Sequence, residues 1–202
     1  VDNGVKEITL LGQNVNAYES DGFRLSDLIL SIEKLNEIKR VRYTTSHPKD
    51  MTDDLIEVYK SSNKIMPLVH LPVQSGSNKI LKLMNRNHSI ENYLETFNKL
   101  KEINSKIEFS SDFIIAYPGE ENQDFEDTLN LIKKVKFINS YSYIFSPRPG
   151  TVSENLNLID KKTSFERLEI IQNELFENQI QRNKSLENSI VEVLVENFTE
   201  DK

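Results

Sequence analysis

Short apolar runs alternate with longer segments of helical period along the first 150 residues of the chain. The runs are rich in β-branched and aromatic residues, and Gly, Pro, Asn or Ser residues follow them, which is typical of buried strands. We therefore predict strands over residues 8–11, 41–45, 68–73, 107–116 and 141–145.

The segments between these runs place apolar residues at i, i+3, i+4 and i+7, which puts them on one face of a helix. The stretch from Leu25 to Ile38 is one example, and Ser26 can cap its first turn. Thr52 can cap the next helix in the same way. The predicted helices cover residues 25–38, 52–60, 77–84, 90–103 and 121–136.

This alternation predicts an α/β fold with a parallel sheet, because parallel neighbours need crossover helices between them. Five β-α units in series are typical of a barrel or of a large part of one. In such folds the active site lies at the carboxyl ends of the strands. Those ends are polar and rich in Gly or Pro, and they cover residues 12–14, 46–48, 74–76, 118–120 and 146–148.

The pattern changes after Thr151. Residues 161–183 predict one long helix rich in Glu, Asn and Gln, and residues 189–196 alternate apolar and polar positions as an exposed strand does. A lone strand is marginally stable, so we expect it to begin a further β domain. The expected division is a first domain over residues 1–186 and the start of a second over residues 187–202.

Composition narrows the possible chemistry. The chain has no cysteine, which excludes disulfides, thiolate metal sites and cysteine nucleophiles, and which fits a cytoplasmic protein. Its net charge of −7 argues against a broad phosphate-binding surface. No apolar run approaches the roughly 20 residues that span a bilayer, so no membrane partner is expected. The first residue is Val and opens directly onto a strand, so we expect a piece of a longer protein.

Five stretches at the strand ends resemble, in order, the motifs of the radical S-adenosylmethionine methylthiotransferases. They are LLGQNVNAY (10–18), RYTTSHP (42–48), HLPVQSGS with MNR (70–77 and 84–86), SDFIIAYPGE (111–120) and FSPRPGT (145–151). The GQNVNAY and TTSHP stretches resemble the branch that methylthiolates isopentenyladenosine beside the tRNA anticodon.

The resemblance implies a fold and an activity. The fold would be a partial (β/α)6 radical-SAM barrel lacking its first strand, with the start of a C-terminal TRAM-like, RNA-binding β-barrel module. The parent enzyme would transfer a methylthio group to N6-isopentenyladenosine by radical C–H activation. It would use S-adenosylmethionine and two 4Fe–4S clusters, with tRNA as substrate and an electron donor of the flavodoxin or ferredoxin type. The cluster cysteines are missing here, so we expect this piece to be inactive alone.

The resemblance also assigns ligand contacts. Gly12-Gln13-Asn14 would hold the methionine amino group, because an ammonium needs acceptor oxygens and glycine permits close backbone approach. Gln74 and Ser75 would contact the ribose hydroxyls. On the residues alone, the first stretch is also typical of a strand-to-loop turn and the second of a helix N-terminus.

Arg86 would pair with the methionine carboxylate through its bidentate fork, or else satisfy the last carbonyls of a surface helix. The strand over residues 107–116 would receive the adenine, with apolar Ile114 on the face of the base. Ala116 stands where the family usually has Gly. The residues implied on the adenine side are Asp112, Ile114, Pro118, Gly119 and Glu120.

Four residues at strand ends would face the substrate: Ser46, His47, Ser146 and Arg148. The Pro-rich stretch around Arg148 is also typical of a rigid turn. His70 and His88 are expected to be structural, and no residue of this chain is expected to bind a metal or to be catalytic.

Other functions stay open at this point. One is a methylthiotransferase that acts on threonylcarbamoyladenosine in tRNA or on a ribosomal protein. Another is a non-radical α/β enzyme that binds a nucleotide through the same strand ends. A third is a non-catalytic, RNA-binding relic.

Overall fold

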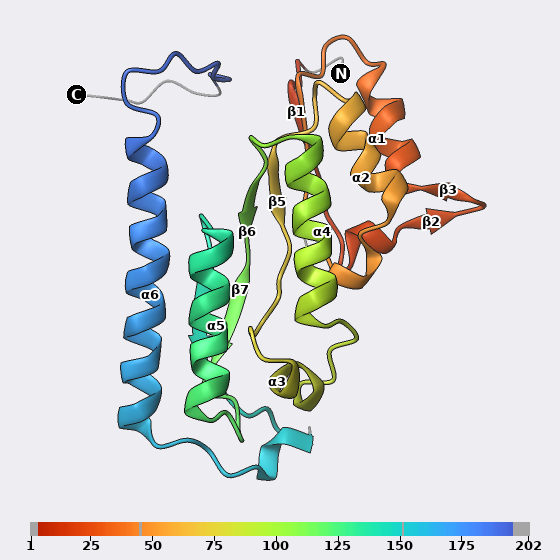
Figure 1. Ribbon diagram of the computed structural model, residues 1–202. Helices are drawn as coiled ribbons and strands as arrows, with labels where there is room; N and C mark the ends of the chain where they lie inside the picture. Colours follow the sequence, from red (N-terminus) through yellow and green to blue (C-terminus); the bar gives the residue numbers. More distant parts are fainter. Residues whose placement is uncertain (1–3, 45, 151, 196–202) are drawn as a thin grey trace.

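The computed structural model describes residues 4–44, 46–150 and 152–195. It has a mixed α/β fold in which parallel strands alternate with helices (Figure 1). The parallel strands are β1 (Glu7–Leu10), β4 (Arg40–Tyr43), β5 (Leu68–His70), β6 (Glu108–Ser110), β7 (Asp112–Ile115) and β8 (Tyr141–Ile144).

These strands pair in chain order. β1 pairs with β4, β5 with β6, and β7 with β8, and each pair is parallel. Single parallel bridges, from Val41 to Ile65 and from Gln74 to Phe113, connect one pair to the next. The predicted parallel arrangement is therefore confirmed.

Helices supply the crossovers that parallel strands need. They are α1 (Leu25–Glu33), α2 (Asp53–Ser61), α4 (Ile90–Ile103) and α5 (Asn122–Val135), with the short α3 (Asn78–Leu83) ahead of α4. Alternate strand positions are buried on the helix side, as the two-residue period of a strand requires. The buried positions include Val41, Tyr43, Val69, Phe109, Phe113 and Ile115.

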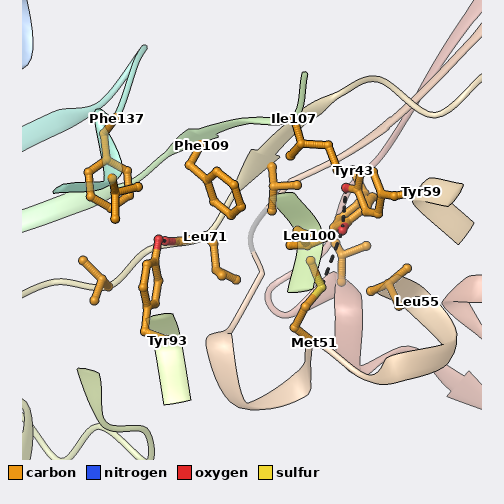
Figure 2. Close-up of a cluster of buried hydrophobic side chains, with 14 of the residues drawn as sticks. Tyr43, Met51, Leu55, Tyr59, Leu71, Tyr93, Leu100, Ile107, Phe109 and Phe137 are labelled. Atoms are coloured by element: carbon orange, nitrogen blue, oxygen red, sulfur yellow. Dashed lines mark hydrogen bonds between the residues drawn. The ribbon is translucent and has the colours of Figure 1, made fainter. Parts of the chain in front are cut away.

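The core lies between the strands and these helices (Figure 2). Phe109 and Leu100 are buried, and burial of one such side chain stabilises the fold by about 1.5–3 kcal/mol. The buried tyrosines keep their hydroxyls bonded: Tyr59 donates to Tyr43 at 2.8 Å, and Tyr93 donates to the Leu71 carbonyl at 3.0 Å. The polar ends of these large side chains therefore cost the core little.

One element was not predicted from the sequence. β2 (Glu19–Ser20) and β3 (Phe23–Arg24) form an antiparallel hairpin across Asp21 and Gly22. Both turn residues have positive φ, 51° and 78°, as a type I′ hairpin turn requires. The Asp-Gly pair is the sequence signal for such a turn.

Three predicted boundaries were wrong. The strand predicted over residues 68–73 ends at His70. α1 ends at Glu33 rather than near residue 38. Its N-cap is Arg24, whose amide donates a hydrogen bond to the Asp27 carboxylate at 2.9 Å. Ser26 lies inside the helix and donates to Asp54 at 2.6 Å. The strand predicted over residues 107–116 is divided between β6 and β7, because the Ser111 amide donates to the Ser140 hydroxyl instead of a ladder partner.

The C-terminal part confirms the long helix but not the strand after it. The 3-10 helix η3 (Val152–Asn155) leads to α6 (Lys161–Lys184), which packs against α5 and β8. Residues 189–195 form no strand, since no described segment pairs with them, and Glu196 lies outside the described residues. No helix within the described ranges is long and apolar enough to cross a membrane.

Candidate functional site at the strand ends

Two neighbouring strand ends are tied together by side-chain hydrogen bonds. Asn16, in the 3-10 helix η1 (Val15–Ala17) after β1, accepts from the His47 amide and donates to its carbonyl, both at 2.9 Å. Asn14 donates to Asp50 at 2.6 Å. The loop that holds Gly12, Gln13 and Asn14 therefore lies beside the loop that holds His47, while its own residues 11–14 stay exposed.

Buried polar atoms without a hydrogen-bond partner gather at the same place. Among the described residues they are the Ser46 hydroxyl, Arg86 Nε, both ring nitrogens of His88 and, elsewhere, one Glu7 oxygen. The His47 and His88 rings meet edge to face, with 5.4 Å between their centroids. An unsatisfied buried polar group costs about 1–3 kcal/mol, so such a cluster at strand ends indicates a place for a polar ligand group.

The charges of this cluster follow from burial. Burial lowers the pKa of His88 to about 4, and electrostatic repulsion from His47 and Arg86 lowers it as well. The Val73 backbone acts in the opposite direction, although neither ring nitrogen of His88 forms a hydrogen bond. Burial also lowers the pKa of His47, against the attraction of Asp50. Arg86 stays protonated, since a guanidinium does not lose its proton in proteins. At neutral pH the cluster therefore offers one cation beside neutral imidazoles and a hydroxyl, which suits a carboxylate.

The stretch Gln74-Ser75-Gly76 leads into the N-terminus of α3, where Ser77 is the N-cap and accepts from the Ile80 amide. Gln74 has φ 74°. Its amide donates to the Asp112 carbonyl of β7, and its carbonyl accepts from the Ile114 amide of the same strand. Ser75 is fully buried, and its hydroxyl contacts Thr128 of α5 at 3.3 Å and accepts from the Ser77 amide. A Cβ at Gly76 would lie 2.4 Å from the Thr128 Cα atom. The Ser75 side chain thus serves helix packing, and any ligand contact there falls to Gln74 or the backbone.

Asp112 and His70 lie on adjacent strands, on the side away from the helices. His70 Nε2 is 3.6 Å from Asp112 Oδ2, and His70 Nδ1 is 2.9 Å from the Ser110 hydroxyl. Asp112 therefore has the partner that a carboxylate in an apolar strand needs. These contacts fit the structural role expected of His70.

Three predicted residues, one from β7 and two from the segment after β8, meet in one cavity. Ile114, Ser146 and Arg148 line a space of about 350 Å³, together with Tyr143 and Phe145. Its walls are largely apolar and aromatic, with a cation and a hydroxyl among them. Such a lining suits an aromatic base with polar edges.

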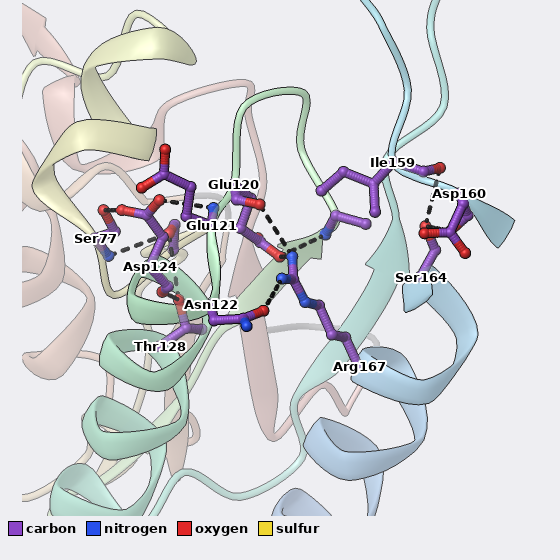
Figure 3. A network of polar contacts seen from close by, with 12 residues as sticks. Ser77, Glu120, Glu121, Asn122, Asp124, Thr128, Ile159, Asp160, Ser164 and Arg167 are labelled. Atoms are coloured by element: carbon purple, nitrogen blue, oxygen red, sulfur yellow. Dashed lines mark hydrogen bonds and ion pairs between the residues drawn. The ribbon is translucent and has the colours of Figure 1, made fainter. Parts of the chain in front are cut away.

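Glu120 is buried, and its side chain is hydrogen-bonded within the fold (Figure 3). Its Oε1 atom accepts from the Ala116 amide at 3.2 Å and from Arg167 of α6 at 2.8 Å, and its side chain is 2% exposed. Burial raises the pKa of Glu120, while Arg167 opposes that shift. Pro118 is buried, and Gly119 is exposed with φ 87°. Of this stretch, Gly119 alone presents an accessible backbone.

Sequence reasoning missed Arg167. The one signal was its position, because Ser164, Arg167, Ile171, Leu175 and Asn178 form the buried stripe of α6. An arginine on the stripe that faces the core needs a buried partner. The sequence did not indicate that the partner is Glu120.

An iron–sulfur cluster does not fit this chain by itself. The sequence has no cysteine, and the described residues contain no group of three His, Asp or Glu that could hold a metal ion. Any cluster that acts at these strand ends must be held by ligands from outside these residues.

Curated relatives match all or nearly all of the chain. It is 67% identical to the tRNA-2-methylthio-N(6)-dimethylallyladenosine synthase of Pelagibacter ubique over 100% of this chain and 46% of that protein. It is 50% identical to the synthase of the same name from Rickettsia canadensis over 96% of this chain and 45% of that protein. The chain thus spans about half the length of these relatives.

Solved structures share the fold at low identity. Coproporphyrinogen III oxidase (HemN) of Escherichia coli, a radical SAM enzyme, matches with a TM-score of 0.63 and 14% identity over 86% of this chain and 41% of its own. Streptococcus suis SuiB bound to S-adenosylmethionine matches with a TM-score of 0.52 and 15% identity over 90% and 37%. The Radical SAM superfamily model matches residues 1–132, more than half of the sequence. The chain therefore belongs to the radical SAM superfamily.

Proposed function

We propose that the protein containing this chain transfers a methylthio group to N6-isopentenyladenosine in tRNA, using S-adenosylmethionine and iron–sulfur clusters. The 67% identity to a synthase of that name, over the whole chain, is the observation that carries the proposal. No described feature favours instead the branches that act on threonylcarbamoyladenosine or on a ribosomal protein.

The fold proposal is a partial radical-SAM barrel over residues 1–186, followed at residues 187–202 by the start of a TRAM-like module. Three parallel pairs in chain order, and the likeness to HemN, support the barrel. The module rests on the resemblance of the sequence alone, because residues 189–195 form no strand.

The residues at the strand ends fit the parts of S-adenosylmethionine. The exposed Gln13 and Asn14 would accept from its amino group. Its carboxylate would accept from Arg86 Nε, the Ser46 hydroxyl and the protonated ring nitrogen of His88, which are unpartnered otherwise. The cavity beside Ile114 would take the adenine. When bound beside a reduced cluster, the cofactor supplies the radical chemistry that activates the adenosine C–H bond.

The remaining parts of the reaction come from outside this chain. Both 4Fe–4S clusters would be held by cysteines elsewhere in the protein, and an electron donor of the flavodoxin or ferredoxin type would reduce them. Alone, this chain would be inactive. The cytoplasmic location stays a prediction. Ser146 and Arg148 would face the tRNA or the adenosine that enters above the cofactor.

Nucleoside analysis of tRNA tests this function. We expect 2-methylthio-isopentenyladenosine to disappear from a strain that lacks the gene containing this sequence, and isopentenyladenosine to accumulate in its place. The full-length gene should restore the modified nucleoside. An unchanged amount of it in the deletion strain would refute the assignment, and loss of methylthio-threonylcarbamoyladenosine instead would assign the other tRNA branch.

A further inference from the structure

A turn in an unusual conformation follows β7. Ala116 has φ 57°, in the left-handed region that a residue with a Cβ atom rarely adopts. The turn over residues 116–120 closes with a hydrogen bond from the Glu120 amide to the Tyr117 carbonyl and another from the Ala116 amide to the Glu120 carboxylate. Ala116 and Glu120 are both buried. Strained turns of this kind persist only when their surroundings hold them.

Arg167 of α6 holds this turn from outside. Its Nη1 atom donates to the Glu120 carboxylate at 2.8 Å and to the Glu120 carbonyl at 3.2 Å, and its Nη2 atom donates to Asn122 at 2.8 Å. The guanidinium also lies 5.4 Å from the centre of the Phe125 ring. One side chain therefore fixes both the turn and the start of α5, as Figure 3 shows.

The turn borders the place proposed for the adenine. Ile114 lines the 350 Å³ cavity, and Ala116 follows two residues later at the end of the same strand. Ala116, Phe145 and Ser146 line a neighbouring cavity of about 430 Å³ on the side of α6. Arg167 lines neither cavity, so it can affect a ligand there only through the turn.

We propose that Arg167 is a positioning residue that holds the turn over residues 116–120 in the conformation that binds the adenine of S-adenosylmethionine. Through Arg167, the packing of α6 would affect how tightly the cofactor binds. This inference rests on the proposed function. A planar fork suits the role, because it bonds a carboxylate, a carbonyl and an amide oxygen at once, which the point charge of a lysine does not.

The same helix offers a matched control. Arg182 of α6 pairs with Glu108 at 2.6 Å, but Glu108 opens β6, at the end of the strands opposite to the ligand cavities. Arg167→Met removes the ion pair from α6 to the turn, and Arg182→Met removes the ion pair from α6 to β6. Only Arg167→Met releases the turn.

The test uses the full-length, cluster-loaded protein and the probe S-adenosylhomocysteine, whose dissociation constant is measured by calorimetry beside the melting temperature. We expect Arg167→Met to weaken binding about tenfold, the change that follows if only about a tenth of the molecules keep the turn in its binding conformation. Amide exchange over residues 116–120 should accelerate. Arg167→Lys should recover only part of the affinity. Arg182→Met should lower the melting temperature without changing the affinity.

Equal affinity of Arg167→Met and wild type would overturn the inference and leave the proposed function standing. A wild-type protein that binds no S-adenosylhomocysteine would instead overturn the proposed function. If Arg167→Met does not fold, Arg167→Lys and Asn122→Ala carry the same comparison, because each removes only part of the fork. Unchanged affinity and unchanged exchange in both would then contradict the role.

Discussion

At the scale of single residues, Ala116 shows a conflict between side chain and backbone. Its left-handed φ of 57° costs a non-Gly residue about 1–2 kcal/mol, and a glycine avoids this cost. A glycine also gives the unfolded chain more conformational freedom, which offsets part of the stabilisation. We expect Ala116→Gly to raise the free energy of unfolding by about 1 kcal/mol in denaturant titrations. Gly76→Ala should act oppositely, since its Cβ would meet the Thr128 backbone at 2.4 Å. A destabilised Ala116→Gly would contradict this reading.

His88 carries a prediction about pH at the same scale. Burial lowers its pKa to about 4, below the usual 6.5, so the folded state favours the neutral ring. Its contribution to stability is then fully present above pH 6.5 and is lost as pH falls toward 4. Over this pH range the free energy of unfolding of the wild type should fall by about 2 kcal/mol more than that of His88→Gln. This figure is reduced from the full pKa shift because the ring is partly exposed to solvent. An NMR titration of the His88 ring checks the cause, and a midpoint at 6.5 would contradict it.

At the scale of elements, Asp124 joins the start of α5 to the start of α3. Asp124 accepts from Ser77 at 2.6 Å, from Lys79 at 2.9 Å and from the Glu121 amide at 2.9 Å. Burial acts to raise the pKa of Asp124, but these partners outweigh it, so the net shift is downward. The carboxylate therefore stabilises the fold above the usual pKa, and this contribution is lost as pH falls through its lowered value.

Replacement of Asp124 tests that junction. Asp124→Asn keeps the shape but removes the charge and one acceptor oxygen, and it should lower the free energy of unfolding by about 1–2 kcal/mol, as loss of a helix cap does. Thermal unfolding at neutral pH measures the loss. Glu126→Gln, on the exposed face of the same helix, is the control and should change little. If both variants lower the free energy of unfolding equally, the hydrogen bonds of Asp124 do not stabilise the fold more than an exposed glutamate does.

The elements also show how far the sequence predicts this structure. α4 was predicted over residues 90–103 and has those bounds, because its apolar period and its cap at Ser89 are local. The pairing of Glu120 with Arg167 joins residues 47 positions apart, and no local pattern indicates it. The strand expected over residues 189–196 had the right alternation, yet a strand also needs a partner, and none is described. Local order was predictable, whereas long-range partners were not.

At the scale of the whole molecule, we propose that the strand ends provide ligand contacts, while the metal centre is held by other parts of the protein. Iron–sulfur clusters are held mainly by cysteine thiolates, and this sequence has none. We expect the 202-residue chain, treated with iron and sulfide, to show helical circular dichroism but no cluster absorption in the visible range. The full-length protein, treated identically, should show it. Stoichiometric cluster uptake by the chain would mean that other side chains serve as ligands. That result would contradict the proposal that these strand ends position the cofactor while the rest of the protein holds the clusters.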